Sequence, residues 1–150
     1  MAYTAQLTDA AASFHERMFP GYVSDFLRTD PEFIERFDNF AFDEVVAVTP
    51  LLDDRTRMLR WLATLLGCQG IDEFRGMVNA ALNVGVEPEA IQEVVYQATA
   101  YLGIGRVFPF IKAKNELFEA RGIALPLAEQ TTTTPDLESR REGGDRKSVV

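Results

Sequence analysis

Apolar side chains recur at the spacing of one helical face along most of the first 122 positions of the chain. No segment shows the alternation of apolar and polar residues that is typical of a half-buried strand. Turn and capping residues separate the periodic stretches from one another. The pattern therefore predicts an all-α fold with about six helices.

Two helices are predicted before residue 50. Thr8 or Asp9 can cap a first helix that runs through Met18. The run Thr-Asp-Pro-Glu at 29–32 is a start signal for a second helix, because a capping side chain precedes a proline at the first helical position. Thr49 and Pro50 end this region. One apolar face of the second helix is formed by Phe33, Ile34, Phe37, Phe40 and Ala41.

A third and a fourth helix are predicted between residues 53 and 85. Asp53 is a candidate cap for the third helix, and Gly67 fits the left-handed position just past its end. Asp72 is a candidate cap for the fourth helix, which stops at Gly85. The third helix is expected to bury Met58, Leu59, Leu62, Ala63, Leu65 and Leu66, and the fourth Phe74, Met77, Val78, Ala81 and Leu82.

The last two predicted helices are followed by a change in composition. Glu-Pro-Glu at 87–89 opens the fifth helix, and residues 106–121 form the sixth, with Pro109 tolerated in its first turn. After residue 127 the chain offers little to bury. We predict a helical domain over 1–127 with its motif core at 52–122, and a polar, flexible tail or connector over 128–150.

Composition and charge narrow the function classes. The net charge is −8 and the pI is near 4.7, which disfavours nucleic acid or an anionic membrane as a partner. No apolar run approaches the roughly 18 residues of a membrane helix, and no secretory leader is visible, so a cytoplasmic location is predicted. One cysteine and one histidine make a disulfide framework or a metal site improbable.

Three motifs in the second half of the chain carry a family resemblance. They are Ala81-xxx-Gly85, Val86-xxxx-Ile91-xx-Val94 and Tyr101-Leu-Gly103. Their order and spacing resemble the carboxymuconolactone decarboxylase / alkylhydroperoxidase D-like superfamily. The resemblance implies a helical core that pairs between subunits, a homo-oligomer (trimer or hexamer), and a pocket at or near a subunit interface.

A longer run is similar to the N-terminal copy of a subgroup with two tandem domains. It extends from residues 30–44 to residues 121–127, and residues 131–144 resemble the connector to a second copy. We expect either a shortened tandem protein or a natural one-domain version.

The resemblance implies two reaction types. Peroxiredoxin activity in the superfamily uses a Cys-x-x-Cys pair followed by His, and those positions hold Gly70, Glu73 and Met77 here. A self-contained dithiol cycle is therefore excluded. Cys68, between two predicted helices, remains a candidate thiol if another molecule or subunit supplies the resolving thiol; otherwise it is a small buried hydrophobic residue.

The second type is decarboxylation of an unsaturated lactone, which needs no cofactor. The family's Glu-Leu-x-x-His step corresponds to Glu73, Phe74 and Met77, so the acid is kept and the histidine is lost. Glu73 is the candidate general acid or base. Its simpler interpretation is an acid that stabilises the first turn of a helix.

Other candidate site residues complete this prediction. His15 is a candidate replacement for the missing histidine, or a structural histidine. Arg106 or Arg57 is the candidate carboxylate anchor, or a surface ion-pairing residue. Tyr96 is a candidate oxyanion donor, or a core or interface residue; Met77 is a candidate substrate contact, or core filling.

Three functions stay open at this point. The first is a cofactor-free lyase for a small carboxylated lactone or related acid. The second is a thiol-dependent peroxide or disulfide reductase that uses Cys68. The third is a non-catalytic, oligomeric ligand-binding module, which Met77 in the histidine position favours.

Overall fold

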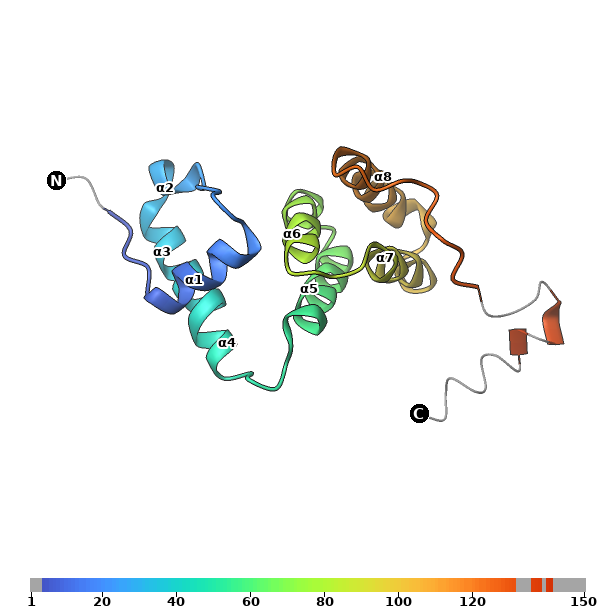
Figure 1. The fold of residues 1–150 in the computed structure, drawn as a ribbon, viewed down its shortest axis with the longest axis horizontal. Helices are drawn as coiled ribbons and strands as arrows, with labels where there is room; N and C mark the ends of the chain where they lie inside the picture. Colours follow the sequence, from blue (N-terminus) through green and yellow to red (C-terminus); the bar gives the residue numbers. More distant parts are fainter. Residues whose placement is uncertain (1–3, 132–135, 139, 142–150) are drawn as a thin grey trace.

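Every regular element in the described part of the chain is helical. A computed structural model describes residues 4–131, 136–138 and 140–141 (Figure 1). The six predicted helices are α1 (Asp9–Met18), α3 (Pro31–Asn39), α5 (Asp54–Cys68), α6 (Ile71–Asn83), α7 (Pro88–Leu102) and α8 (Ile104–Ala120). Two short helices, α2 (Phe26–Thr29) and α4 (Val45–Ala47), and a π-helical turn, η1 (Phe40–Glu44), add to them. The all-α prediction is confirmed.

The helices α5 to α8 form a bundle in which α5 and α8 each pack against both α6 and α7. The rings of Phe74 on α6 and Phe110 on α8 meet edge to face, with centroids 5.0 Å apart. Met58, Leu62 and Leu66 of α5 are fully buried, as the spacing predicts. None of the helices in the described residues is long and apolar enough to cross a membrane.

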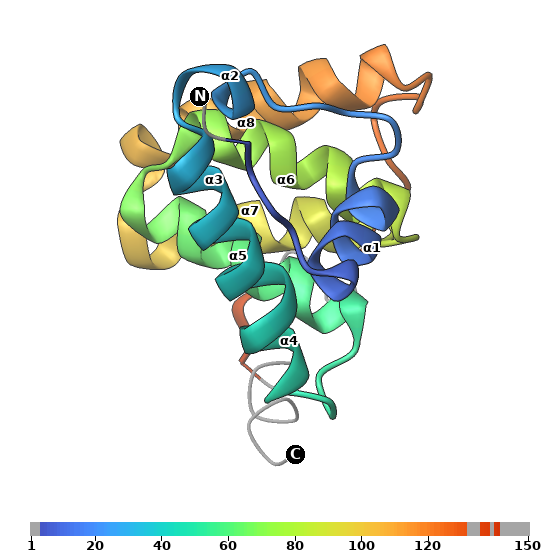
Figure 2. The same ribbon diagram turned by 90° about the vertical axis from the view of Figure 1, so that its left-hand side faces the viewer.

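The helices α1 to α4, which we call the N-terminal unit, lie on one side of α6, opposite α7 and α8 (Figures 1 and 2). Thr8 caps α1 as predicted, because its hydroxyl accepts a hydrogen bond from the Ala11 N–H at 3.1 Å. The Asn83 amide at the end of α6 donates to the Met18 carbonyl at 2.7 Å. This bond joins the end of α1 to the bundle.

Two predicted helix boundaries were wrong by a few residues. Gly67 lies inside α5, and Gln69 takes the left-handed conformation after it, at φ 61°. The Gln69 side chain donates to the Leu66 carbonyl at 2.6 Å, which satisfies the helix end without glycine. Asp72 lies in the first turn of α6, and the N-cap is Gly70.

The apolar face predicted for residues 33–41 is only partly buried. Ile34 and Asp38, four residues apart on α3, and Phe42 in the π-helical turn face inward, and each is 7% exposed. Phe33, Phe37 and Phe40 are 63%, 44% and 58% exposed. The predicted tail over 128–150, including most of the connector-like stretch, lies largely outside the described residues.

Candidate functional site

A cavity of about 700 Å³ lies between α6 and the N-terminal unit. Its size falls in the range that is usual for small-molecule sites. Rings from α1, α2, α3, η1 and the segment after α1 line much of it, and we call it the aromatic cavity. The rings belong to His15, Phe19, Tyr22, Phe26, Phe33, Phe37 and Phe42.

The cavity wall is continuous with the core beneath it. The His15 ring lies 5.2 Å from the ring of Phe19 and 6.0 Å from that of Phe42, measured between centroids. Phe42 in turn stacks at 5.8 Å on Phe14, which is buried one position before His15 on α1. Packing of this kind fixes the direction of the His15 ring.

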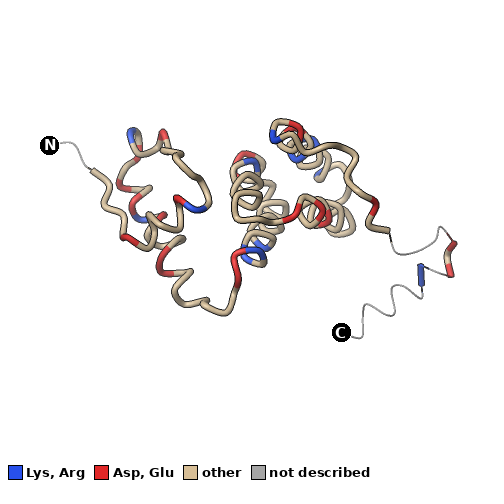
Figure 3. Tube along the Cα trace, in the orientation of Figure 1, with Lys and Arg blue, Asp and Glu red and all other residues tan. Residues whose placement is uncertain are grey.

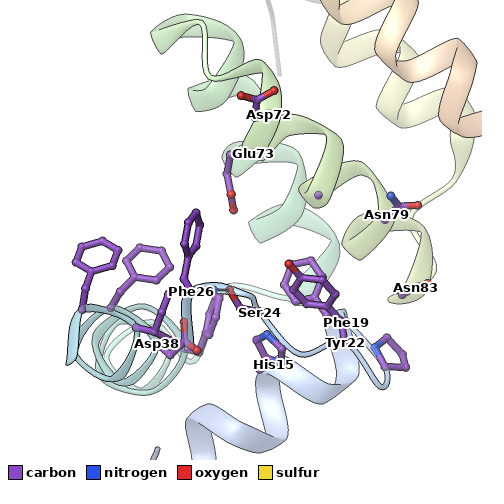
Figure 4. Close-up of a pocket in the computed structure, with 16 residues that line it drawn as sticks. His15, Phe19, Tyr22, Ser24, Phe26, Asp38, Asp72, Glu73, Asn79 and Asn83 are labelled. Atoms are coloured by element: carbon purple, nitrogen blue, oxygen red, sulfur yellow. Dashed lines mark hydrogen bonds between the residues drawn. The ribbon is translucent and has the colours of Figure 1, made fainter. Parts of the chain in front are cut away.

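Glu73 and His15, two of the residues singled out in the sequence, line this same cavity. Glu73 is in the first turn of α6 and its exposed side chain points into the cavity, with His15 on the opposing wall (Figure 4). The family pattern carries its histidine at Met77, one turn further along α6, but Met77 is 4% exposed and faces the core. His15, on α1, therefore lines the cavity, whereas α6 contributes no histidine to it.

Asp38 is a cavity residue that the sequence analysis missed. It lies on α3 between Ile34 and Phe42, on the buried face of that segment. Burial raises the pKa of the Asp38 carboxyl, and the nearby His15 charge opposes that rise. The signal that would have identified it is an acid four residues after the inward Ile34, and so on the buried face of the same helix.

Two amides that line the cavity are already engaged. Asn79 Oδ1 accepts from Arg121 Nε at 3.0 Å, and Asn83 Oδ1 accepts from Arg121 Nη1 at 2.8 Å. Their amide nitrogens donate to the carbonyls of Arg75 and Met18. These bonds hold α6, α8 and α1 together, so both side chains serve to position the wall.

Arg57, the first of the proposed carboxylate anchors, is 3% exposed and does not line the cavity. Its guanidinium donates to the Thr49 hydroxyl at 2.9 Å and to the Leu52 carbonyl at 3.1 Å. These bonds hold the segment between α4 and α5.

Cys68, Tyr96 and Arg106 lie outside the aromatic cavity and are exposed. The Cys68 sulfur, at the end of α5, is 3.6 Å from the Leu65 carbonyl oxygen. Tyr96 on α7 is 46% exposed, and its ring centroid lies 5.6 Å from the Lys114 ammonium.

The charge of the cavity is unusual for an anion site. Asp38, Asp72 and Glu73 line it, and among the described lining residues His15 is the one basic side chain. Lys and Arg residues are scattered among the acids along the described helices (Figure 3). No group of three or more His, Cys, Asp or Glu side chains that could hold a metal ion occurs in the described residues.

Comparison with known proteins agrees with this architecture. The model of the carboxymuconolactone decarboxylase family matches residues 31–113, from the start of α3 into α8. A 4-carboxymuconolactone decarboxylase of Acinetobacter baylyi is 31% identical over 102 residues, which cover 68% of this chain and 73% of that protein. Asp38 and Glu73 fall within the family match, and His15 precedes it.

Proposed function

The chain belongs to the carboxymuconolactone decarboxylase family, and from this premise we propose that it is a cofactor-free, decarboxylase-like enzyme of the cytoplasm. Its substrate would be a small carboxylated lactone or a related acid. The observation that carries the proposal is the aromatic cavity, in which Glu73 and His15 line one space of about 700 Å³.

The reaction requires little from the protein beyond orientation and a proton. The bond between the ring carbon and the carboxylate breaks, CO2 leaves, and the electron pair remains on the lactone as a dienolate. A proton then bonds to carbon, so one proton is consumed for each CO2 released. An apolar wall favours this step because the localised carboxylate charge becomes delocalised and the leaving group is neutral.

We assign the proton chemistry to Glu73 and His15. Glu73 acts as general acid or base at the mouth of the cavity, and His15 takes the place of the histidine that Met77 replaces. The lining residues include no Lys or Arg. In a trimer or hexamer, the exposed Arg106 and Tyr96 of a neighbouring copy are our candidates for the carboxylate anchor and the oxyanion donor.

Turnover of 4-carboxymuconolactone, followed by ultraviolet absorbance, tests this proposal. The wild type, Glu73→Gln and Glu89→Gln are assayed together at high enzyme concentration. Glu89 is a matched control, because it is also an acid in the first turn of a helix but does not line the cavity. We expect at least about a hundredfold lower kcat/KM in Glu73→Gln alone, as general acid–base groups contribute 10²–10⁴-fold.

No turnover of this lactone or of related monocarboxylic lactones by the wild type would contradict the proposal. Thiol chemistry is then the second candidate, since the Cys68 sulfur is accessible at the end of α5. Peroxide-dependent oxidation of an added dithiol, lost in Cys68→Ser, would support it. Ligand binding without either reaction would leave the binding-module function.

A further inference from the structure

We propose that Asp38 and His15 form a proton-transfer pair in the aromatic cavity, in which Asp38 returns the proton to the substrate carbon after CO2 has left. This inference rests on the proposed function and assigns its last step, the protonation of carbon, to Asp38. Glu73 then keeps only its general acid–base contact with the substrate at the mouth of the cavity. His15 passes the replacement proton from solvent to Asp38.

Asp38 is mostly buried, yet no described hydrogen bond gives its side chain a structural role. Its neighbours on the same segment are used: the Asn39 amide pairs with the backbone of Gln6 and Thr8, and Asp43 accepts from the Thr8 hydroxyl at 2.8 Å. In the described part of the chain no hydrogen bond reaches the Asp38 carboxyl. The carboxyl of this mostly buried residue therefore faces the cavity, where a ligand or water can reach it. Acids in such surroundings cluster at functional sites.

The carboxyls of Asp38 and Glu73 have different surroundings in the cavity. Asp38 is 7% exposed on the N-terminal unit, whereas Glu73 is exposed on α6. Figure 4 shows them on opposing walls, with His15 on the same side as Asp38. Paired acids in unlike environments are the arrangement by which one fold separates a proton donor from an ionised partner.

The surroundings of Asp38 favour its protonated form, which the last step of the reaction requires. Burial raises the pKa of Asp38, which favours the neutral acid in an empty or substrate-filled cavity. The positive form of His15 lowers that pKa, which favours release of the Asp38 proton. Among the described residues, Tyr22 and, on α6, Asp72 and Glu73 are the other ionisable groups that line the same space.

The proposed step balances. The dienolate carbon forms a C–H bond with the proton of the Asp38 carboxyl, whose O–H bond breaks to leave a carboxylate. The imidazolium of His15 then returns a proton to that carboxylate through water in the cavity and is itself reprotonated from solvent. The cycle consumes one proton from solvent and leaves both side chains in their starting forms.

Nuclear magnetic resonance of the single histidine tests the pair without any substrate. Because His15 is the one histidine of the chain, its ring signals need no assignment. In Asp38→Asn we expect the pH midpoint of these signals to move to lower pH, since a nearby negative charge is removed. Asp9→Asn, a change of an exposed acid in the first turn of α1, should leave the midpoint in place.

Kinetics test the role of the donor. Asp38→Asn should lower kcat at least about a hundredfold with a small change in KM, whereas Asp9→Asn should match the wild type. The decline of kcat as pH rises should also vanish in Asp38→Asn. Circular dichroism verifies that the variant is folded.

The outcomes separate the two proposals. An unchanged His15 midpoint in folded Asp38→Asn would overturn the pair, whether or not the enzyme turns over a lactone. A shifted midpoint together with wild-type kcat in Asp38→Asn would overturn the role of Asp38 as donor. Absence of turnover by the wild type itself would refute the decarboxylase function while the resonance result still decides the pair.

Discussion

Two hollows among the described residues have nearly equal size and very different chemistry. The aromatic cavity encloses about 700 Å³ between α6 and the N-terminal unit. A second cavity of about 690 Å³ lies along α5 and α7. Small and aliphatic residues form most of the second wall, with Arg55, Glu93, Gln97 and Tyr101 among them.

The difference lies in how the polar groups of each hollow are used. In the second cavity, Arg55 forms an ion pair with Glu87 at 3.0 Å, and Glu93 accepts from Gln97 at 3.4 Å. In the aromatic cavity, Asp38 is buried beside His15 without a hydrogen bond from the described residues. Volume alone therefore does not identify a site; an acid that faces the hollow without a hydrogen bond from the protein is the distinguishing feature here.

Filling each cavity in turn, by substitution of a glycine in its wall, is the change with the largest expected effect on activity. Gly76 on α6 lines the aromatic cavity and Gly67 on α5 lines the second cavity. A Cβ atom added at either position would meet nothing within 4 Å. We expect Gly76→Leu to fill the aromatic cavity and lower kcat/KM at least about a hundredfold, since misplacement of about 1 Å already has effects of that order.

Gly67→Leu is the matched control. Both substitutions replace a helical glycine, which should stabilise each helix by about 0.5–1 kcal/mol through propensity. Gly67→Leu should therefore leave turnover unchanged. Steady-state kinetics and thermal unfolding of both variants check the pair, and an equal loss of activity in the two would show that the aromatic cavity is not the active site.

Capping residues and prolines in the sequence predicted where most of the long helices begin. Thr8, Asp53, Pro31 and Pro88 all act at the helix starts where their chemistry predicts them. A predicted boundary was wrong where another residue took the expected position. At the end of α5, Gln69 and not Gly67 adopts the left-handed conformation. The relation to the tandem subgroup stays a prediction.

The site was less readable, because it is assembled from elements that are distant in sequence. Glu73 was found through the family pattern, and His15 through its being the one histidine. Arg57 and Tyr96 could not be placed, because burial and helix direction depend on tertiary packing. Asp38 was missed because only apolar positions of that segment were followed, although it lies four residues after Ile34 on the same helical face.

Asn83 tests the attachment that keeps the walls of the aromatic cavity together. Asn83→Ala removes the bonds to the Met18 carbonyl and to Arg121. We expect the free energy of unfolding to fall by about 1–2 kcal/mol, since each bond contributes about 0.5–1.5 kcal/mol. Activity should also fall, because α1 carries His15. Urea denaturation and kinetics measure the two effects.

Asn115→Ala is the matched control, since the Asn115 side chain makes no hydrogen bond within the described residues and lies on α8. It should change the free energy of unfolding by less than about 0.5 kcal/mol. If both variants were equally stable, the link from α6 to α1 would not hold the N-terminal unit in place.

Substitution of Lys114 is expected to have the smallest effect on stability, and Lys114 can be compared with Asp38 as a second buried charged residue. It is 1% exposed on α8, and burial lowers its pKa from 10.5. Unlike Asp38 it has partners: its ammonium donates to Gln92 Oε1 at 2.7 Å and lies 5.1 Å from the Phe118 ring centroid. We therefore assign Lys114 to the fold of the bundle and not to a site.

Lys114→Met should raise the free energy of unfolding by about 1 kcal/mol at pH 7, because a buried charge is replaced by an apolar side chain of similar length. As pH rises from the lowered folded pKa towards 10.5, the unfolded chain binds more protons than the folded one. Wild-type stability then rises relative to the variant, and the difference between them narrows. Urea denaturation of both proteins between pH 7 and pH 10 measures this difference in the free energy of unfolding. Lys112→Met, at an exposed position of α8, is the control. A variant less stable than the wild type at pH 7 would show that the Gln92 bond and the ring contacts outweigh the burial of the charge.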